Sequence, residues 1–273
     1  MHAITPPSPE APIPTELLLR AYRAGIFPMA DSRDDEQVFW VEPRERAVIP
    51  LDGFRCSRSL AKVIRQDRFR VTCDAAFSAV IDACAAPRPD HPETWISERI
   101  GASYLALHAA GHAHSIECWD GEDLVGGLYG VAFERTFCGE SMFSRTRDAS
   151  KVALAWLVAL LRRAGYTLLD CQFMTPHLAS MGAVAISRDE YLRRLAAAVS
   201  QQPRTSLPEA YTSVLSSAGA AVGAGAGGAS AGAAGSAVGA GAGLRAAPEV
   251  EGRVEPEASS PGKLIAQSLT HTS

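Results

Sequence analysis

Three polar side chains in apolar surroundings are the best candidates for chemistry in this chain of 273 residues. Asp170 and Gln172 lie two positions apart in the strand-like run Tyr166–Phe173, so they share one face of that strand. Glu140 lies in a second apolar run and comes close to the pair if both runs join one sheet. A carboxylate beside an amide can orient an amine and accept from it without becoming a nucleophile. The set therefore suits transfer of an apolar acyl group to an amine, although a hydrogen-bonded structural pair would give the same pattern.

Other common chemistries find less support in the sequence. There is no GxxxxGK[ST] motif and no GxGxxG motif after a strand, which excludes P-loop and dinucleotide-binding folds. Cys171 could be a nucleophile, but cysteines in the middle of strands are mostly inert core residues. His112, His114 and Glu117 could form a metal site, but Glu117 has the opposite strand parity. We therefore expect these three residues to belong to the sheet, with no bound metal.

Two strands, a helix and a third strand must position the candidate residues. The strands Gly126–Phe133 and Thr136–Met142 are joined by a tight reversal. The helix Lys151–Ala164 is apolar on nearly all sides, which predicts that it is buried, and the strand Tyr166–Phe173 follows it. Glycines inside a strand mark bends or places where a ligand or another backbone comes close, and the first strand contains three of them: Gly126, Gly127 and Gly130.

The composition is that of a folded protein of the cytoplasm. Apolar residues make up 47% of the chain, and the net charge of −4 means that any contact with a polyanion needs a local basic patch. Six cysteines without a CxxC pair favour reduced thiols and a cytoplasmic location. The N-terminus does not have the pattern of a signal peptide. The longest apolar run, Val152–Leu161, is too short to span a bilayer, so we expect no membrane partner.

Changes in composition divide the chain into four parts. Residues 1–14 are rich in proline and are expected to form a flexible arm. Residues 15–55 suggest a small N-terminal domain, and residues 56–200 contain the strands and helices of the main domain. Residues 201–273 form a low-complexity tail that is rich in alanine and glycine. Such a tail buries too little surface to offset its ordering entropy, so we expect it to be disordered.

A stripe of basic side chains follows one face of the predicted helix Arg58–Asp67. Arg58, Lys62 and Arg65 are spaced four and three residues apart, which places them side by side on a helix. The stripe is either a solvated helix face or a site for phosphate groups, and the residues alone leave both interpretations open.

Eight short segments in a fixed order carry a family resemblance. They are AYRAGIFPM, FWVEPRERAVIP, RSLAK, ETWI, LHAAGHAHSIECW, LVGGLYGVAFERTFCGESMFSR, DASKVAL and LLDCQF. In this order and spacing they resemble the leucyl/phenylalanyl-tRNA–protein transferase family over about residues 15–198. The resemblance implies an α+β fold, in which a small N-terminal domain joins a GNAT-like (acetyltransferase-related) mixed sheet with flanking helices.

The resemblance also implies a reaction and its partners. Leu or Phe, and by extension Met, would move from its tRNA to the N-terminal Arg or Lys of a protein, creating an apolar N-terminus that marks the product for degradation. The partners would be Leu-tRNA, Phe-tRNA and the acceptor proteins, with no cofactor and a monomeric enzyme. Gln172 would contact the amine or the carbonyl, Asp170 would hold and polarise Gln172, and Glu140 would hold an amino group. Whether these residues act as a general base or only as positioning groups stays open.

The resemblance assigns further residues to three binding regions. An apolar aminoacyl pocket would contain Leu128, Phe137, Met142, Leu154, Leu157, Leu161 and Leu169. The leucines of the buried helix, which are otherwise plain core, would then form part of the pocket wall. Adenosine at the tRNA end would be bound by Trp95, Tyr104, Tyr22 and Met29. The stripe Arg58, Lys62 and Arg65 would take acceptor-stem phosphates, which are contacts that carry no sequence information.

The sequence departs from the family pattern at several positions. Met29 replaces a common tryptophan, Gln66 follows Arg65 where a second basic residue is frequent, and Thr175 replaces a common asparagine. Met29 concerns adenosine binding and Gln66 concerns phosphate binding, and none of the three departures touches Asp170, Gln172 or Glu140. Two other classes stay open. One is a CoA-dependent acyltransferase, which would need a glycine-rich pyrophosphate loop that residues 143–150 do not offer. The other is a module without catalysis that binds tRNA or protein N-termini that signal degradation.

Overall fold

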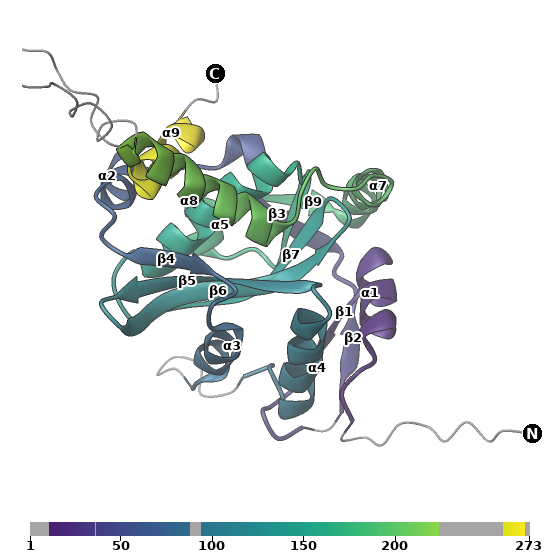
Figure 1. The fold of residues 1–273 in the computed structure, drawn as a ribbon. Helices are drawn as coiled ribbons and strands as arrows, with labels where there is room; N and C mark the ends of the chain where they lie inside the picture. The colour runs from purple at the N-terminus through teal and green to yellow at the C-terminus, as the bar shows by residue number, and fades with distance from the viewer. Residues whose placement is uncertain (1–10, 36, 88–93, 224–258, 271–273) are drawn as a thin grey trace, which may run out of the picture.

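The computed structural model describes residues 11–35, 37–87, 94–223 and 259–270. It shows a mixed α+β fold with one large sheet, a small two-stranded sheet and flanking helices (Figure 1). In chain order the elements are α1 Thr15–Arg23, β1 Phe27–Met29, β2 Phe39–Val41, β3 Glu45–Val48, the 3-10 helix η1 Leu51–Gly53, α2 Arg58–Arg65, β4 Arg70–Cys73, α3 Phe77–Ala85, α4 Glu98–Ala109, β5 Ala113–Asp120, β6 Asp123–Phe133, β7 Thr136–Ser144, α5 Ala149–Ala164, β8 Leu168–Gln172, α6 Pro176–Ser180, β9 Val184–Ser187, α7 Arg188–Val199, α8 Leu207–Gly223 and α9 Pro261–Thr270.

The large sheet contains seven strands in the order β4-β5-β6-β7-β8-β3-β9. Adjacent strands in this sheet are antiparallel, except that β7 and β8 run parallel and are connected by α5. Helices α3 and α4 cover one face of the sheet, while α2, α5 and α8 lie on the other (Figure 1). Two apolar cores fill the spaces between these helices and the sheet, so the sheet is the middle layer of the main domain.

Helix α5 fixes the geometry of the parallel pair β7 and β8. It is buried on nearly every side, as its apolar sequence predicts. It ends at Gly165, whose φ of +82° is a left-handed conformation that glycine adopts without strain. At its start, a Cβ atom on Gly126 of β6 would lie 2.5 Å from the Cβ of Ala149, so only glycine permits this approach. The predicted order of two strands, a helix and a third strand is confirmed, with bounds that shift by a few residues.

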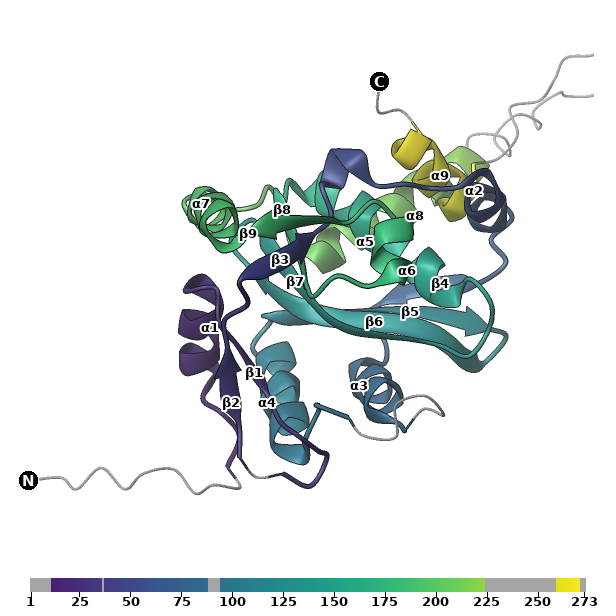
Figure 2. The same ribbon diagram turned by 180° about the vertical axis from the view of Figure 1, so that it is seen from behind.

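The N-terminal part consists of α1 and the two-stranded sheet of β1 and β2, and α1 packs against α4 and α7 (Figure 2). Strand β3, which the sequence analysis placed in the small domain of residues 15–55, lies instead between β8 and β9 in the large sheet. Its last residues, Ala47 and Val48, are buried with Ile49 after them. An apolar run of this kind needs partners on both faces, which the central layer of the main domain supplies.

The prediction of a disordered tail over residues 201–273 is wrong for two segments. Helix α8 packs against α5 and β4 and buries Leu207, Ala210 and Val214. Helix α9 lies beside α2 and buries Ile265 and Leu269 (Figure 1). Both segments contain apolar residues at helical spacing, which the averaged composition of the tail conceals. Residues 224–258 and 271–273 of the predicted tail lie outside the described residues, as do residues 1–10 of the predicted arm.

Candidate functional site

Glu140 projects into the site because β7 contains one extra residue at this point. Tyr129 of β6 pairs with Ser141, and the next residue, Gly130, pairs with Gly139, so Glu140 has no partner on β6. A β-bulge of this kind re-aims the side chain of the extra residue. Glycine is required opposite the bulge, because a Cβ on Gly130 would lie 2.2 Å from a backbone oxygen of β7.

Gln172 occupies a second irregular point, at the end of β8. Its φ is +60°, and the N–H of Phe173 donates to the carbonyl oxygen of Cys171 at 2.7 Å. This is a γ-turn with positive φ at its central residue, a rare and strained conformation. The backbone N–H of Gln172 donates to Asp170 Oδ1 at 2.8 Å. Pairing between β7 and β8 stops at Asp170, so the two strands separate beyond it.

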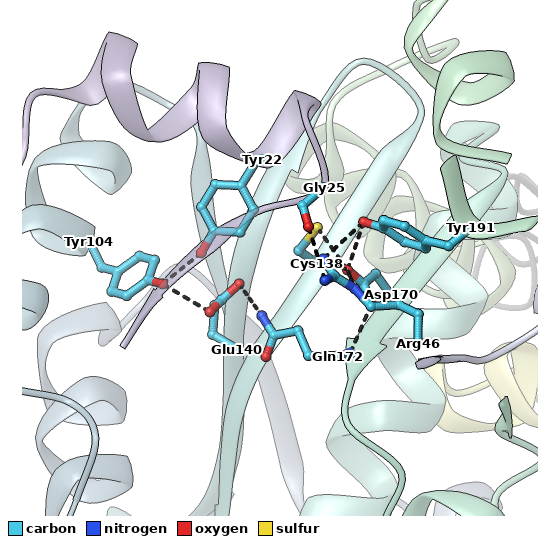
Figure 3. A network of polar contacts seen from close by, with 9 residues as sticks. All are labelled: Tyr22, Gly25, Arg46, Tyr104, Cys138, Glu140, Asp170, Gln172 and Tyr191. Carbon is cyan, nitrogen blue, oxygen red and sulfur yellow. Dashed lines mark hydrogen bonds and ion pairs between the residues drawn. The ribbon is translucent and has the colours of Figure 1, made fainter. Parts of the chain in front are cut away.

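Gln172 and Glu140 meet between the separating strands (Figure 3). Gln172 Nε2 donates to Glu140 Oε1 at 2.8 Å, and the Tyr104 hydroxyl donates to Glu140 Oε2 at 2.9 Å. The Tyr22 hydroxyl lies 2.6 Å from that of Tyr104 and extends this chain. Burial raises the pKa of Glu140 to about 7, although the hydrogen bonds from Gln172 and the tyrosines oppose the rise. Glu140 therefore changes its protonation state near neutral pH.

Asp170 belongs to a separate cluster, shown with Arg46 and Tyr191 in Figure 3. Arg46 Nε lies 3.1 and 3.0 Å from the two carboxylate oxygens, and the Tyr191 hydroxyl donates to Oδ2 at 2.9 Å. Burial alone would lower the pKa of Arg46, but the Asp170 carboxylate holds that pKa above its ordinary value. Asp170 is fully buried and contacts the backbone of Gln172. The prediction that Asp170 holds Gln172 agrees with this backbone contact, while the side-chain amide of Gln172 bonds Glu140, so polarisation of that amide by Asp170 stays a prediction.

An apolar cavity of about 590 Å³ opens beside Glu140 and Gln172, which form part of its wall. Five residues of the predicted aminoacyl pocket also line it: Leu128, Met142, Leu154, Leu157 and Leu169. The other two predicted residues, Phe137 and Leu161, are fully buried in the core and do not line the cavity. The size and apolar lining suit a small-molecule group such as an amino-acid side chain.

The four residues predicted to bind adenosine separate into two pairs. Met29 and Trp95 are half-buried and line the cavity. Tyr22 and Tyr104 are fully buried, and their rings pack against other aromatic rings. Their hydroxyl groups lead to Glu140, and their contact with adenosine stays a prediction.

The predicted basic stripe is exposed on α2. Arg58, Lys62 and Arg65 all reach solvent, although α9 packs beside the same helix. Their exposure is compatible with both interpretations, a solvated face and a phosphate site.

Two alternative chemistries are weakened by the environment of their residues. Burial raises the pKa of the Cys171 thiol, so Cys171 is not activated as a thiolate. His114 Nδ1 lies 2.7 Å from Asp74 Oδ2, and Glu117 accepts hydrogen bonds from two hydroxyl groups. Within the part of the chain that the structure describes, no three His, Cys, Asp or Glu side chains gather as a metal site.

Sequence reasoning missed Arg46, Tyr191 and His177. A signal for Arg46 existed, because Asp170 within an apolar strand requires a cation or several donors when it is buried. His177 lines the cavity, and its Nε2 is buried without a hydrogen-bond partner among the described residues. Burial and the nearby Lys151 lower the pKa of His177. Neither His177 nor Tyr191 stood out in the sequence, since both lie on helices where such residues commonly pack.

An apolar cavity with an amide and a carboxylate at its wall fits an enzyme that transfers an acyl group. Comparison with known proteins makes the class specific. Residues 48–196 match the model of the leucyl/phenylalanyl-tRNA protein transferase, and residues 12–44 match the N-terminal domain of the same protein. The chain belongs to the leucyl/phenylalanyl-tRNA protein transferase family, so the resemblance read from its motifs is confirmed.

Curated relatives agree with this assignment. A leucyl/phenylalanyl-tRNA–protein transferase of Novosphingobium aromaticivorans is 62% identical over 264 residues, covering 96% of this chain and 97% of the relative. One of Zymomonas mobilis is 60% identical over 188 residues, covering 69% and 70%. Among solved structures, L-PGS from Bacillus licheniformis shares 13% identity with a TM-score of 0.33, over 60% of this chain and 55% of that one. A likeness this slight supports no conclusion. Among the described residues, no helix is long and apolar enough to cross a membrane.

Proposed function

We propose that this protein transfers Leu or Phe, and also Met, from aminoacyl-tRNA to the N-terminal Arg or Lys of acceptor proteins. The observation that carries the proposal is the contact of Gln172 with Glu140 at the wall of the apolar cavity. Family membership supports a tRNA ester as the donor and a protein as the acceptor. The product then carries an apolar N-terminus that marks it for degradation.

The reaction needs alignment more than chemical activation, because the donor is already an ester. The acceptor nitrogen attacks the ester carbonyl carbon, the bond from that carbon to the ribose oxygen breaks, and the ribose oxygen takes up a proton. Since Nε2 of Gln172 is bound to Glu140, Oε1 is the end of the amide that accepts from the attacking amine. Ionised Glu140 holds an amino group of one substrate beside it.

Asp170 acts in this scheme as a positioning residue. Its carboxylate holds the backbone N–H of Gln172 at 2.8 Å, and it is fully buried away from the substrates. The geometry therefore favours positioning over proton abstraction for Asp170.

The cavity selects the transferred side chain by shape. Leu154 and Leu157 of α5 and Leu169 of β8 form apolar walls that suit unbranched or γ-branched side chains. Side chains branched at Cβ are rejected, although one methyl group is worth only about 1–3 kcal/mol of discrimination. Trp95 stacks on the terminal adenine, and Met29 packs on it through its polarizable thioether. The exposed cations on α2 take phosphates of the acceptor stem.

The proposed fold type is GNAT-like. Antiparallel β5, β6 and β7 are followed by β8, which is parallel to β7 and separates from it at the site. We also propose that the enzyme acts as a monomer.

The test uses tRNA charged with radiolabelled leucine and a model protein that begins with Arg, without CoA or ATP. A protein that begins with Gly is the control acceptor, and Gln172→Ala is the control enzyme. Label on the Arg protein alone, lost with Gln172→Ala, is the expected result. Charged tRNA that binds without any transfer would instead identify a binding module and overturn the proposal.

A further inference from the structure

We infer that Arg46 is a positioning residue of this reaction: through Asp170 it holds the strained turn that presents Gln172 to the substrates. The inference rests on the proposed function, because it assumes that the Gln172 amide meets the reacting groups. It assigns a role to a residue on β3, in a part of the sheet that does not line the cavity.

Each nitrogen of the Arg46 guanidinium group has a hydrogen-bond partner, and only 2% of the residue is exposed. Nε contacts both carboxylate oxygens of Asp170, and Nη2 lies 2.9 Å from Oδ2. Nη1 donates to the Gly25 carbonyl oxygen at 3.1 Å, and Nη2 donates to the Tyr191 hydroxyl at 3.2 Å. The guanidinium lies over the rings of Phe27 and Tyr191, 4.8 and 4.3 Å from their centroids. Three of these contacts reach the Asp170 carboxylate, and together with the hydrogen bond from the Tyr191 hydroxyl they favour one orientation of it (Figure 3).

That orientation matters because Asp170 Oδ1 accepts from Arg46 and from the backbone N–H of Gln172. A residue with φ of +60° stays in this conformation only when its surroundings fix it. In a regular strand, Gln172 would share a face with Asp170, whereas the turn directs its side chain to Glu140. Without Arg46, a buried carboxylate would lose its counter-ion and turn toward other donors. The turn at Gln172 would then lose the contact that holds it.

A purely structural role explains this cluster less well. A fully buried ion pair contributes little net stability, because the desolvation of both charges offsets their attraction. Here the ion pair touches the one strained residue of β8, two positions along the chain from its own carboxylate. The geometry therefore links the pair to the position of Gln172.

The experiment measures kcat and KM for Leu-tRNA and for an acceptor that begins with Arg. Arg46→Lys keeps the charge but cannot contact the carboxylate, the Gly25 carbonyl and the Tyr191 hydroxyl together. Tyr191→Phe keeps the ring and removes one donor to Asp170, so it tests the same contact in a milder way. Arg23→Lys is the matched control, because Arg23 forms an exposed, bidentate pair with Glu134 away from the site.

We expect Arg46→Lys to lower kcat about 100-fold, the loss that a small misplacement of a reacting group produces, with both KM values unchanged. Tyr191→Phe should lower kcat about tenfold, as expected for one hydrogen bond to a charged group. Arg23→Lys should leave both constants unchanged. If Arg46→Lys does not fold, the kcat of Tyr191→Phe alone tests the inference.

Two outcomes would overturn the inference while leaving the proposed function in place. In the first, folded variants keep the wild-type kcat. In the second, KM rises and kcat does not change, which would assign Arg46 to the shape of the cavity. Absence of transfer by the wild-type protein would overturn the proposed function, and the role of Arg46 with it.

Discussion

At the scale of single residues, Glu140 and Gln172 meet because each occupies an irregular point of its strand. The bulge in β7 leaves Glu140 without a ladder partner, and the turn at the end of β8 gives Gln172 a positive φ. Both side chains are then directed into the gap between separating strands. Strain and bulges are common beside active sites, where they re-aim the groups that contact substrate.

The raised pKa of Glu140 predicts a pH-dependent stability. With a folded-state pKa of about 7 against an ordinary value of 4.5, the folded protein binds this proton more tightly than the unfolded chain. The stabilisation is fully present below pH 4.5 and is lost as the pH rises through 7. Relative to Glu140→Gln, the wild-type free energy of unfolding should fall by about 3 kcal/mol from pH 4 to pH 8. Denaturant titrations of both proteins at several pH values measure this difference.

A constant difference between the two proteins over that pH range would contradict the raised pKa. Glu190→Gln is a suitable control, because Glu190 lies on the exposed face of α7 and bonds Arg193 and Arg194. Its replacement should give no loss of relative stability as the pH rises through 7.

The polar residues of the site could be predicted from the sequence, but their directions could not. The sequence predicted that Glu140 comes close to Asp170 and Gln172, and Gln172 does contact it. Strand parity could not give the directions of these side chains, because a bulge and a γ-turn each break the period of two. Arg46 was missed for a different reason: its partner Asp170 lies 124 residues away along the chain. A buried Asp170 indicates that a cation or several donors must be near, but one sequence does not show which distant residue supplies them.

At the scale of elements, the hairpin of β6 and β7 contains the bulge, which can form because residue 130 on the opposite strand is glycine. A Cβ at this position would lie 2.2 Å from a backbone oxygen and 2.4 Å from the Phe137 ring. We expect Gly130→Ala to lower the free energy of unfolding by about 3 kcal/mol through overpacking and to lower activity as Glu140 moves. Thermal and denaturant unfolding measure the first effect, and the transfer assay measures the second.

Gly101→Ala is the matched control for this prediction. Gly101 lies in α4, where a Cβ would meet only Ile81 at 3.8 Å. Alanine there should be neutral or stabilising because it favours the helix. Equal effects of the two substitutions would show that the bulge does not require Gly130.

The elements themselves were largely predictable, since β6, β7, α5 and β8 each have a clear hydrophobic period or an unbroken apolar run. The errors occurred where composition was averaged over long segments. Helices α8 and α9 each contain a short apolar stripe inside a tail rich in alanine and glycine. Strand β3 is only four residues long, and nothing in its sequence indicates that it joins the large sheet.

At the scale of the whole molecule, a protein with a net charge of −4 must bind an anionic tRNA through a local patch. If the cations on α2 take phosphates, Lys62→Ala should weaken binding of charged tRNA and leave kcat unchanged. The slope of log K against log salt concentration should fall in magnitude by about 1. Binding titrations over a range of salt concentrations measure it. Arg193→Ala on α7 is the control, and the same slope change in both variants would argue against a specific patch.

The docking of α9 makes a second prediction at this scale. Leu269 is 4% exposed and belongs to the same core as α2 and α5. Leu269→Ala should destabilise the protein by about 2 kcal/mol, the lower part of the range for buried leucines, because α9 lies at the edge of the core. Denaturant unfolding measures this, with the exposed Leu17→Ala in α1 as the control. Equal stability of the two variants would mean that α9 does not contribute to the cooperative unit.

The position of β3 between β8 and β9 also determines when the enzyme becomes active during its own synthesis. Residues 45–48 leave the ribosome early, but the two strands that flank them are made more than a hundred residues later. Contacts of such long range form late in folding. Arg46 therefore reaches Asp170 only after β8 has emerged, and an incomplete nascent chain has no assembled site with which to modify other proteins.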